Sequence, residues 1–270
     1  MVTALHVRPL VLVLALAACA DDVERAETPS TTSPVAVTTT TTTTTTTTPT
    51  TVLAPTTTTS GAPATVVSRG NPGRRMVALT FDAGADAGFT AQILDVLERS
   101  AVLATFGITG RWAEANADLV RRIDSAGHLL MNHTYEHRSF TGVSARPAVL
   151  SDADRRADVE RADEIIRALT GRSTRPWFRP PYGDYDASVN AVVGALGYRY
   201  NVHWTVDSLG WQGLSPAAIT GRCLDRTVPG AILLFHVGAA SQDAAALPGI
   251  IAGLRQRGYE LGTVADVIAA

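Results

Sequence analysis

The chain has 270 residues and a formal net charge of −2 at pH 7. This near-neutral balance gives no sign of a nucleic-acid-binding protein, which would carry an excess of basic residues. Only Cys223 remains once Cys19 is assigned to an export signal, so the folded part cannot form an internal disulfide and must rely on packing.

The first residues have the features of an export signal. Arg8 provides a weakly basic start, and residues 9–18 form an apolar run that is too short to span a bilayer as a helix. The run ends in Leu16-Ala17-Ala18-Cys19, which resembles a bacterial lipobox, where the cysteine is lipidated and becomes the mature N-terminus. We therefore predict a signal peptide over residues 1–18 and a cell-membrane lipoprotein that faces the cell wall. Ordinary secretion is the alternative, because the same run also fits a small-residue cleavage site.

Residues 19–70 are expected to form a lipidated N-terminus followed by a disordered linker. Threonine dominates this segment, with an unbroken run from Thr38 to Thr48 and prolines at positions 29, 34, 49, 55 and 63. Such a stretch has too little apolar surface to offset the entropy lost on ordering. Its expected role is to hold the following domain away from a membrane surface.

Residues 71–270 are expected to form one domain, which is long enough to bury a core. Expected strands cover residues 76–81, 102–108, 128–132, 198–206 and 231–235, before one final strand. Expected helices cover residues 91–97, 117–125, 152–169, 187–196, 216–223 and 244–257, before one final helix. This alternation is typical of a parallel α/β architecture. A closed barrel is favoured over an open sheet, because no Gly-rich phosphate loop follows the first strand.

Polar residues follow the expected strands at the same end. They are Asp82, His133, Asp207 and His236, together with Arg179, which comes just after Trp177-Phe178. Functional groups gather at the carboxyl ends of the strands in parallel α/β folds. Any one of these residues could be an ordinary cap or turn residue, but five together indicate a site.

Two histidines stand four positions apart in Asn132-His133-Thr134-Tyr135-Glu136-His137. If this segment is helical, both imidazoles lie on one face and can point at one cation, as the helical histidine pairs of zinc hydrolases do. Two surface histidines on a polar turn are the simpler alternative for this pair taken alone.

Five short motifs together resemble those of the polysaccharide deacetylase family, also called the NodB-homology domain or carbohydrate esterase family 4. In chain order they are Thr80-Phe81-Asp82, His133-Thr134-Tyr135-Glu136-His137, Arg179-Pro180-Pro181-Tyr182-Gly183, Asp207-Ser208-Leu209-Gly210-Trp211 and Leu234-Phe235-His236. The resemblance covers residues 76–268. It implies an α/β fold, a distorted (β/α) barrel of about seven parallel strands. It also implies a hydrolase that removes N-acetyl groups from chitin or peptidoglycan, or O-acetyl groups from xylan.

The resemblance also implies a role for each matching residue. His133 and His137 would bind a divalent metal, Zn²⁺ in the first place, which polarises the acetyl carbonyl and activates water. Asp82 would be the general base, with Arg179 keeping it ionised, and His236 the general acid, with Asp207 as its partner. The backbone N–H of Tyr182 would stabilise the oxyanion, and Trp211 and Leu234 would enclose the acetyl methyl group.

The first motif departs from the usual family pattern. The usual pattern has a second aspartate, the third metal ligand, where this chain has Ala83. This variant is closer to a subgroup that includes peptidoglycan N-acetylmuramic acid deacetylases. Either Asp86 supplies a ligand from the same loop, or water fills the place, or the metal is bound weakly.

Three functions remain to be compared. The first is a metal-dependent deacetylase of cell-wall glycan, peptidoglycan above all, with acetylated polysaccharide as its partner and the membrane reached through the N-terminal lipid only. The second is an O-acetyl esterase of the acetylxylan type, and the third is a glycan-binding domain without catalysis. A base, an acid and their orienting partners are all present, which favours an enzyme over a binding domain. We expect a monomer that binds no nucleic acid.

The lipobox leads to the first testable prediction. Cys19→Ala should move the protein from the membrane fraction to the soluble fraction without unfolding the domain, because it removes only the lipidated residue. Cell fractionation followed by immunoblotting measures this. A variant that stays with the membrane would exclude Cys19 as the anchor.

Overall fold

The structure, a computed structural model, describes residues 61–145 and 148–269. The expected signal peptide, Cys19 and the threonine run lie outside these residues. Among the described residues, no helix is long and apolar enough to cross a membrane.

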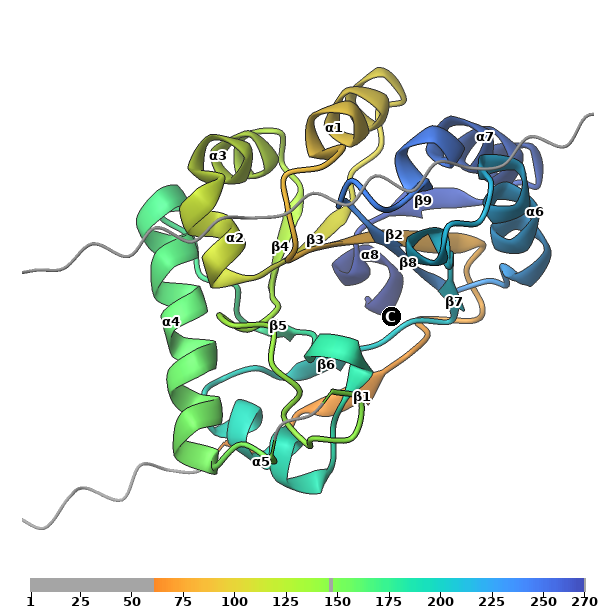
Figure 1. Cartoon of the computed structure of the whole chain (residues 1–270). Coiled ribbons are helices and arrows are strands. Elements are labelled where there is room, and N and C mark those ends of the chain that lie inside the picture. The colour runs from red at the N-terminus through yellow and green to blue at the C-terminus, as the bar shows by residue number, and fades with distance from the viewer. Residues whose placement is uncertain (1–60, 146–147, 270) are drawn as a thin grey trace, which may run out of the picture. The chain divides into compact units, whose positions relative to one another are not determined.

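A parallel β-sheet forms the centre of the domain. Its strands follow the order β1-β6-β5-β4-β3-β2-β8-β7, and β9 pairs with the first residues of β2. The strands are β1 (Thr65–Val67), β2 (Met76–Ala83), β3 (Thr105–Ile108), β4 (Leu129–Asn132), β5 (Trp177–Phe178), β6 (Tyr200–Val202), β7 (Val206–Asp207), β8 (Ile232–His236) and β9 (Glu260–Gly262). Figure 1 shows the sheet curving like part of a barrel, with β1 and β7 at the ends of the strand order.

The α/β fold and its parallel, barrel-like sheet are confirmed. The expected closure of the barrel is wrong, because β1 and β7 end the strand order and no pairing among the described residues joins them. β5 was not among the expected strands, and two further strands differ from expectation. β1 lies inside the expected linker, but it pairs with β6 from Thr65↔Tyr200 to Val67↔Val202, so folded structure begins before residue 71. The strand expected over residues 198–206 is two strands, β6 and β7. Between them His203 N–H bonds Val67 O and Thr205 N–H bonds Ile232 O, so the chain leaves β6 and crosses to β8.

The helices have recognisable end signals. They are α1 (Thr90–Arg99), α2 (Gly110–Ala115), α3 (Ala117–Ser125), α4 (Asp152–Thr170), α5 (Ala187–Ala195), α6 (Pro216–Arg226), α7 (Asp243–Gln256) and α8 (Val264–Ile268), with short 3₁₀ turns at Pro181–Gly183 and Gly210–Gln212. The longest, α4, begins after Ser151, whose side chain accepts a hydrogen bond from Asp154 N–H, and ends at Gly171 in the left-handed conformation. Figure 1 shows α1, α3, α4, α6 and α7 around the outside of the sheet.

Alternate residues of β2 face two different environments. Val77, Leu79 and Phe81 join the apolar cluster beneath the outer helices, and the Phe81 ring stacks on Phe106 and Phe235 at centroid distances of 5.2 and 5.3 Å. Ala78 belongs instead to a cluster that includes Val264 and Val267 of α8. This alternation, which is normal for a strand buried on both faces, sends Thr80 and Asp82 into the interior of the curved sheet, where both contact Arg179.

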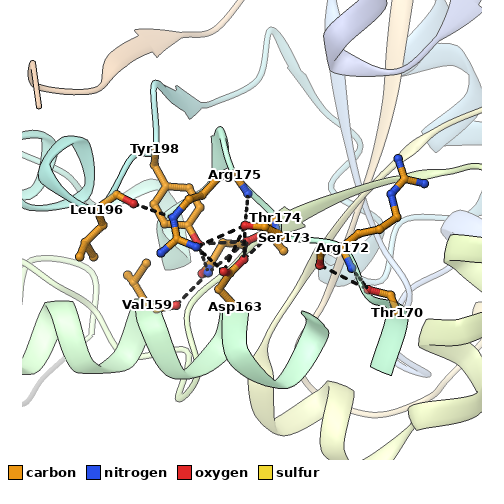
Figure 2. A network of polar contacts seen from close by, with 10 residues as sticks. Val159, Asp163, Thr170, Arg172, Ser173, Thr174, Arg175, Leu196 and Tyr198 are labelled. Atoms are coloured by element: carbon orange, nitrogen blue, oxygen red, sulfur yellow. Dashed lines mark hydrogen bonds and ion pairs between the residues drawn. The ribbon is translucent and has the colours of Figure 1, made fainter. Parts of the chain in front are cut away.

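A buried polar network ties α4 to the end of β4 (Figure 2). Asp163 in α4 accepts hydrogen bonds from Thr174 N–H (2.7 Å) and Thr174 Oγ1 (2.6 Å), and it pairs with Arg175. Thr174 Oγ1 lies 3.0 Å from the Tyr198 hydroxyl, which in turn accepts a hydrogen bond from Asn132 Nδ2 (2.8 Å). Asn132 is the last residue of β4, so this network fixes the strand end that precedes His133.

The Asp163 contacts predict a pH-dependent stability. Burial by itself would raise the pKa of Asp163, but the hydrogen bonds from Thr174 and Ser173 and the charge of Arg175 lower it below the ordinary value of 3.8. The ionised carboxylate therefore stabilises the fold at every pH above its ordinary pKa. This contribution is lost as the pH falls through the lowered pKa of the folded state. Asp163→Asn should reduce the free energy of unfolding by about 1–3 kcal/mol at neutral pH. Urea denaturation should show the difference shrinking in acid, whereas a difference that is constant with pH would contradict the prediction.

The exposed Glu164 on the same helix provides the matched control. Glu164→Gln removes the same charge from a solvated side chain, so it should change stability by no more than about 0.5 kcal/mol at either pH.

Candidate active site

The strand register brings the candidate residues to one level at the carboxyl end of the sheet. Asp82 in β2 pairs with His236 in β8, and Asp207 in β7 pairs with Leu234. Asp82 lies within its strand, one residue beyond the predicted end, because β2 continues to Ala83. Residues that are far apart in the sequence therefore reach one site because the strands are parallel and adjacent.

Asp82 and Arg179 form an ion pair inside the sheet. Arg179 is fully buried, and its Nη1 donates to Asp82 Oδ1 (2.8 Å) and to Thr80 Oγ1 (3.0 Å). Its Nε donates to Val202 O (3.0 Å) and its Nη2 to His203 O (3.3 Å), so the guanidinium joins β2 to β6. Burial by itself would raise the pKa of Asp82. The charge of Arg179, together with smaller contributions from His133 and His236, outweighs burial and lowers this pKa. The carboxylate is therefore ionised at neutral pH.

Gly107 makes room for this carboxylate. It lies opposite Asp82 in β3, and a Cβ atom at that position would be 2.6 Å from Asp82 Oδ1. Gly107 was not among the residues predicted for the site. The available signal was a glycine inside an otherwise apolar strand, which often marks a place where another group approaches the backbone closely.

The histidine pair is on a loop, and the helical arrangement considered for it is wrong. Residues 133–137 follow β4 without forming a helix, and Thr134 and His137 have positive φ angles of 67° and 58°. The loop nevertheless brings the two rings together at a centroid distance of 4.9 Å. Their proximity thus comes from backbone turns that local spacing did not predict.

Both imidazoles have the protonation state of metal ligands. His133 Nδ1 lies 2.9 Å from Arg179 O, and because a carbonyl only accepts, Nδ1 carries the proton and Nε2 keeps its lone pair. That Nε2 is 3.6 Å from Asp82 Oδ2. Burial lowers the pKa of His133, and burial together with His133 lowers the pKa of His137 to about 3. Both rings are therefore neutral at neutral pH.

Asp207 was expected to hold His236 in its cationic form, and among the described residues no hydrogen bond joins the two side chains. Asp207 Oδ1 accepts from Leu209 N–H (2.8 Å) instead, and His236 Nδ1 is buried without a hydrogen-bond partner among the described residues. A different carboxyl group, that of the fully buried Asp243, accepts the backbone N–H of His236 (2.8 Å). Burial raises the pKa of Asp243, although the His236 N–H partly offsets this. Sequence reasoning missed Asp243, because its link to His236 runs through the backbone.

One cavity of about 640 Å³ unites almost all of the predicted site residues. Its lining includes Asp82, Asp86, His133, His137, Tyr182, Asp207, Trp211, Leu234 and His236. Arg179 is fully buried and does not line the cavity, but it donates a hydrogen bond to Asp82, which does. Tyr182 and Trp211 are about half exposed at this cavity, and their rings contact His137 and His236, respectively. Trp204 and Ser144 also line it and were not predicted.

The fit of a metal ion depends on the side chains around the two histidines. Asp86 Oδ1 accepts Ala239 N–H (2.9 Å), and Ala83 is fully buried in the apolar cluster under the outer helices. Within residues 61–145 and 148–269, no group of three or more His, Cys, Asp or Glu side chains is arranged to hold a metal ion. His133 and His137 still fit a divalent cation as two neutral nitrogen donors.

Comparison with known proteins decides the family. The family described as polysaccharide deacetylase matches residues 69–201, a stretch that contains Asp82, His133, His137 and Arg179. A chitooligosaccharide deacetylase of Sinorhizobium fredii is 33% identical over 205 residues, which cover 72% of this chain and 92% of that protein. The chain belongs to the polysaccharide deacetylase family. A peptidoglycan-N-acetylglucosamine deacetylase of Bacillus cereus is 34% identical over 192 residues, 70% of this chain and 66% of that protein.

Solved structures of the polysaccharide deacetylase family share the fold. PdaA of Bacillus subtilis, a family 4 carbohydrate esterase, is 27% identical with a TM-score of 0.67, over 75% of this chain and 84% of that one. A family 4 pseudoenzyme from Bacillus anthracis is 28% identical with a TM-score of 0.70, over 77% of this chain and 70% of that one. The fold thus accommodates both named enzymes and a named pseudoenzyme.

The ion pair leads to a prediction about stability. Arg179→Met should lower the free energy of unfolding by about 3–5 kcal/mol, because it leaves the buried Asp82 carboxylate without its cation. Chemical denaturation at neutral pH measures this loss. Arg179→Met with Asp82→Asn should recover part of it, and a single variant as stable as the parent would contradict the assigned pairing.

Proposed function

We propose that this chain is a hydrolase that removes N-acetyl groups from cell-wall glycan, with peptidoglycan as the first substrate to test. The observation that carries the proposal is the single cavity lined by Asp82, His133, His137 and His236. An ionised carboxylate, two neutral imidazoles and a further imidazole are the groups that metal-assisted amide hydrolysis requires.

We further propose that His133 and His137 hold a divalent cation, for which Zn²⁺ is the first candidate. When bound, such an ion supplies Lewis acidity at the acetyl carbonyl and lowers the pKa of water. The Nδ1–H bond from His133 to Arg179 O supports this role, since it orients the ring and directs the Nε2 lone pair away from the backbone. With two protein ligands, water would complete the coordination.

The proton transfers are assigned to Asp82 and His236. Asp82 Oδ1 accepts a hydrogen bond from Arg179, and Asp82 Oδ2 faces His133. Oδ2 is therefore the oxygen that accepts a proton from the attacking water. The water oxygen bonds to the acetyl carbon, and the carbon–nitrogen bond then breaks. His236 protonates the leaving amine, so that the products are acetate and a free amino sugar. The pairing of Asp82 with His236 on neighbouring strands supports a base and an acid within one cavity.

The remaining lining residues suit an acetylated sugar. Leu234 is buried at the cavity and can contact the acetyl methyl group, while the half-exposed Trp211 and Tyr182 offer ring surface to a pyranose. The Tyr182 backbone N–H is assigned to the developing oxyanion. Relatives named peptidoglycan-N-acetylglucosamine deacetylase, peptidoglycan-N-acetylmuramic acid deacetylase and chitooligosaccharide deacetylase support a glycan as the substrate class.

A second candidate is a glycan-binding domain without catalysis. Ala83 in place of the second aspartate favours it, and so does the similarity to the Bacillus anthracis pseudoenzyme. A mutant of that pseudoenzyme is described as having restored enzymatic activity. The retained Asp82–Arg179 pair supports the hydrolase, because a binding domain needs no buried, ionised base.

The location of this activity is also a proposal. We propose that lipidation of Cys19 anchors a monomer to the cell membrane, and that the threonine-rich segment allows it to reach the wall. Secretion without a lipid is the alternative.

Acetate release tests the function directly. The purified protein should release acetate from peptidoglycan or chitooligosaccharides, and this should stop when a chelator is added. Acetylxylan in parallel identifies the O-acetyl esterase alternative. Asp82→Asn and His236→Ala should each reduce turnover by about 100-fold or more, the scale of a positioned proton-transfer group. Metal content should be unchanged in His236→Ala, and near-parent rates in either variant would show that the assigned base or acid is wrong.

A further inference from the structure

The loop that carries the histidine pair is held in an unfavourable backbone conformation. Thr134 and His137 both have positive φ angles, 67° and 58°, although neither is a glycine. Such a conformation costs of order 1–3 kcal/mol per residue and persists only where the surroundings enforce it. The contacts that hold this loop therefore decide where the His137 imidazole lies.

Asp158 of α4 provides two of these contacts. Its side chain is buried, with an exposed fraction of 2%, and its two oxygens accept the backbone amides of Tyr135 (3.1 Å) and Glu136 (3.2 Å). These are consecutive amides between His133 and His137. Arg138 Nη2 lies 3.5 Å from Asp158 Oδ1 and accompanies the charge. A carboxylate that accepts two amides side by side fixes the path of the backbone more firmly than one neutral acceptor can.

Two further hydrogen bonds stabilise the same loop, one near His133 and one at His137. Asn132 Oδ1 accepts Thr134 N–H (2.9 Å), and Thr134 Oγ1 accepts His137 N–H (3.1 Å). These bonds lie within the segment itself. Asp158 acts from a separate helix, and α4 contacts the loop a second time where the Arg161 guanidinium lies 3.6 Å from the centroid of the Tyr135 ring. Asp158 thus connects the amides of the loop to α4, while the N–H groups of Gly110 (2.9 Å) and Arg111 (3.3 Å) in α2 bond the loop's carbonyls.

We propose that Asp158 is a positioning residue that sets the affinity of the His133–His137 pair for a divalent cation. The inference rests on the proposed function only in taking these two histidines as the ligands. Without the Asp158 carboxylate, two backbone amides lose their acceptor and the left-handed turns lose a support. The loop then relaxes, and the His137 ring is no longer held beside the His133 ring, from which its centroid lies 4.9 Å away.

Zinc affinity tests this role. Asp158→Asn keeps the volume but presents one oxygen and an N–H group to two N–H donors, so it should weaken Zn²⁺ binding by about 10–100-fold, the usual effect of removing a group that orients metal ligands. Competition titration with a chromophoric chelator measures the affinity. The control is Glu164→Gln, a charge loss at an exposed position of the same helix, which should leave it unchanged. A folded Asp158→Asn protein with the parent's affinity overturns the proposal.

Amide hydrogen exchange in the parent protein provides a test that needs no variant. If Asp158 supports zinc binding, zinc must by linkage support the Asp158 contacts. Zinc should therefore slow exchange at the amides of Tyr135 and Glu136, as read by NMR. Exchange that is unchanged by zinc at both amides overturns the proposal even if Asp158→Asn fails to fold.

These readouts separate the inference from the proposed function, because they use zinc alone. Asp158-dependent zinc binding in a protein that releases no acetate would remove the hydrolase and leave the positioning role. Acetate release that resists chelation, in a protein that binds no zinc, would do the opposite.

Discussion

The site depends above all on the buried pair of Arg179 and Asp82. Four hydrogen bonds from one guanidinium connect β2 to β6 across the interior of the sheet, where apolar side chains would otherwise meet. Buried ion pairs add little net stability relative to apolar packing, since both charges lose their hydration. The pair is therefore better explained by what it does to Asp82, which stays ionised while nearly excluded from water.

The same arginine also orients His133. Its carbonyl oxygen accepts His133 Nδ1–H, so one residue positions the carboxylate through its side chain and the first imidazole through its backbone. The second imidazole depends on the loop after β4, whose amides are taken up by Asn132, Thr134 and Asp158. The cavity is thus built from groups with little freedom to move. Such preorganisation suits chemistry in which charge develops at a fixed place.

Ala83 gives this member of the polysaccharide deacetylase family its particular character. Its methyl group belongs to the apolar cluster beneath the outer helices, and the Asp86 carboxylate bonds Ala239 N–H. The ligands proposed for a metal ion, His133 and His137, would therefore be two neutral nitrogens, and the carboxylate nearest to His133 Nε2 is that of Asp82 (3.6 Å), which is assigned to the general base. A cation held in this way keeps more of its Lewis acidity but is bound less tightly, so the groups that hold the histidines in place gain importance.

The sequence by itself determined the parallel α/β fold, the shared location of Asp82, His133, Arg179, Asp207 and His236, and the family. It could do so because buried parallel strands are apolar runs with polar residues at their carboxyl ends, and these patterns are local. Only the tertiary structure decided that β1 belongs to the sheet and that the histidines lie on a strained loop. It also showed that Gly107 leaves room for Asp82, that Asp243 accepts the backbone N–H of His236, and that Asp158 accepts two backbone amides of the histidine loop. These features depend on contacts between segments far apart in the chain, and side chains bonded to backbone amides leave no residue pattern from which such contacts can be read.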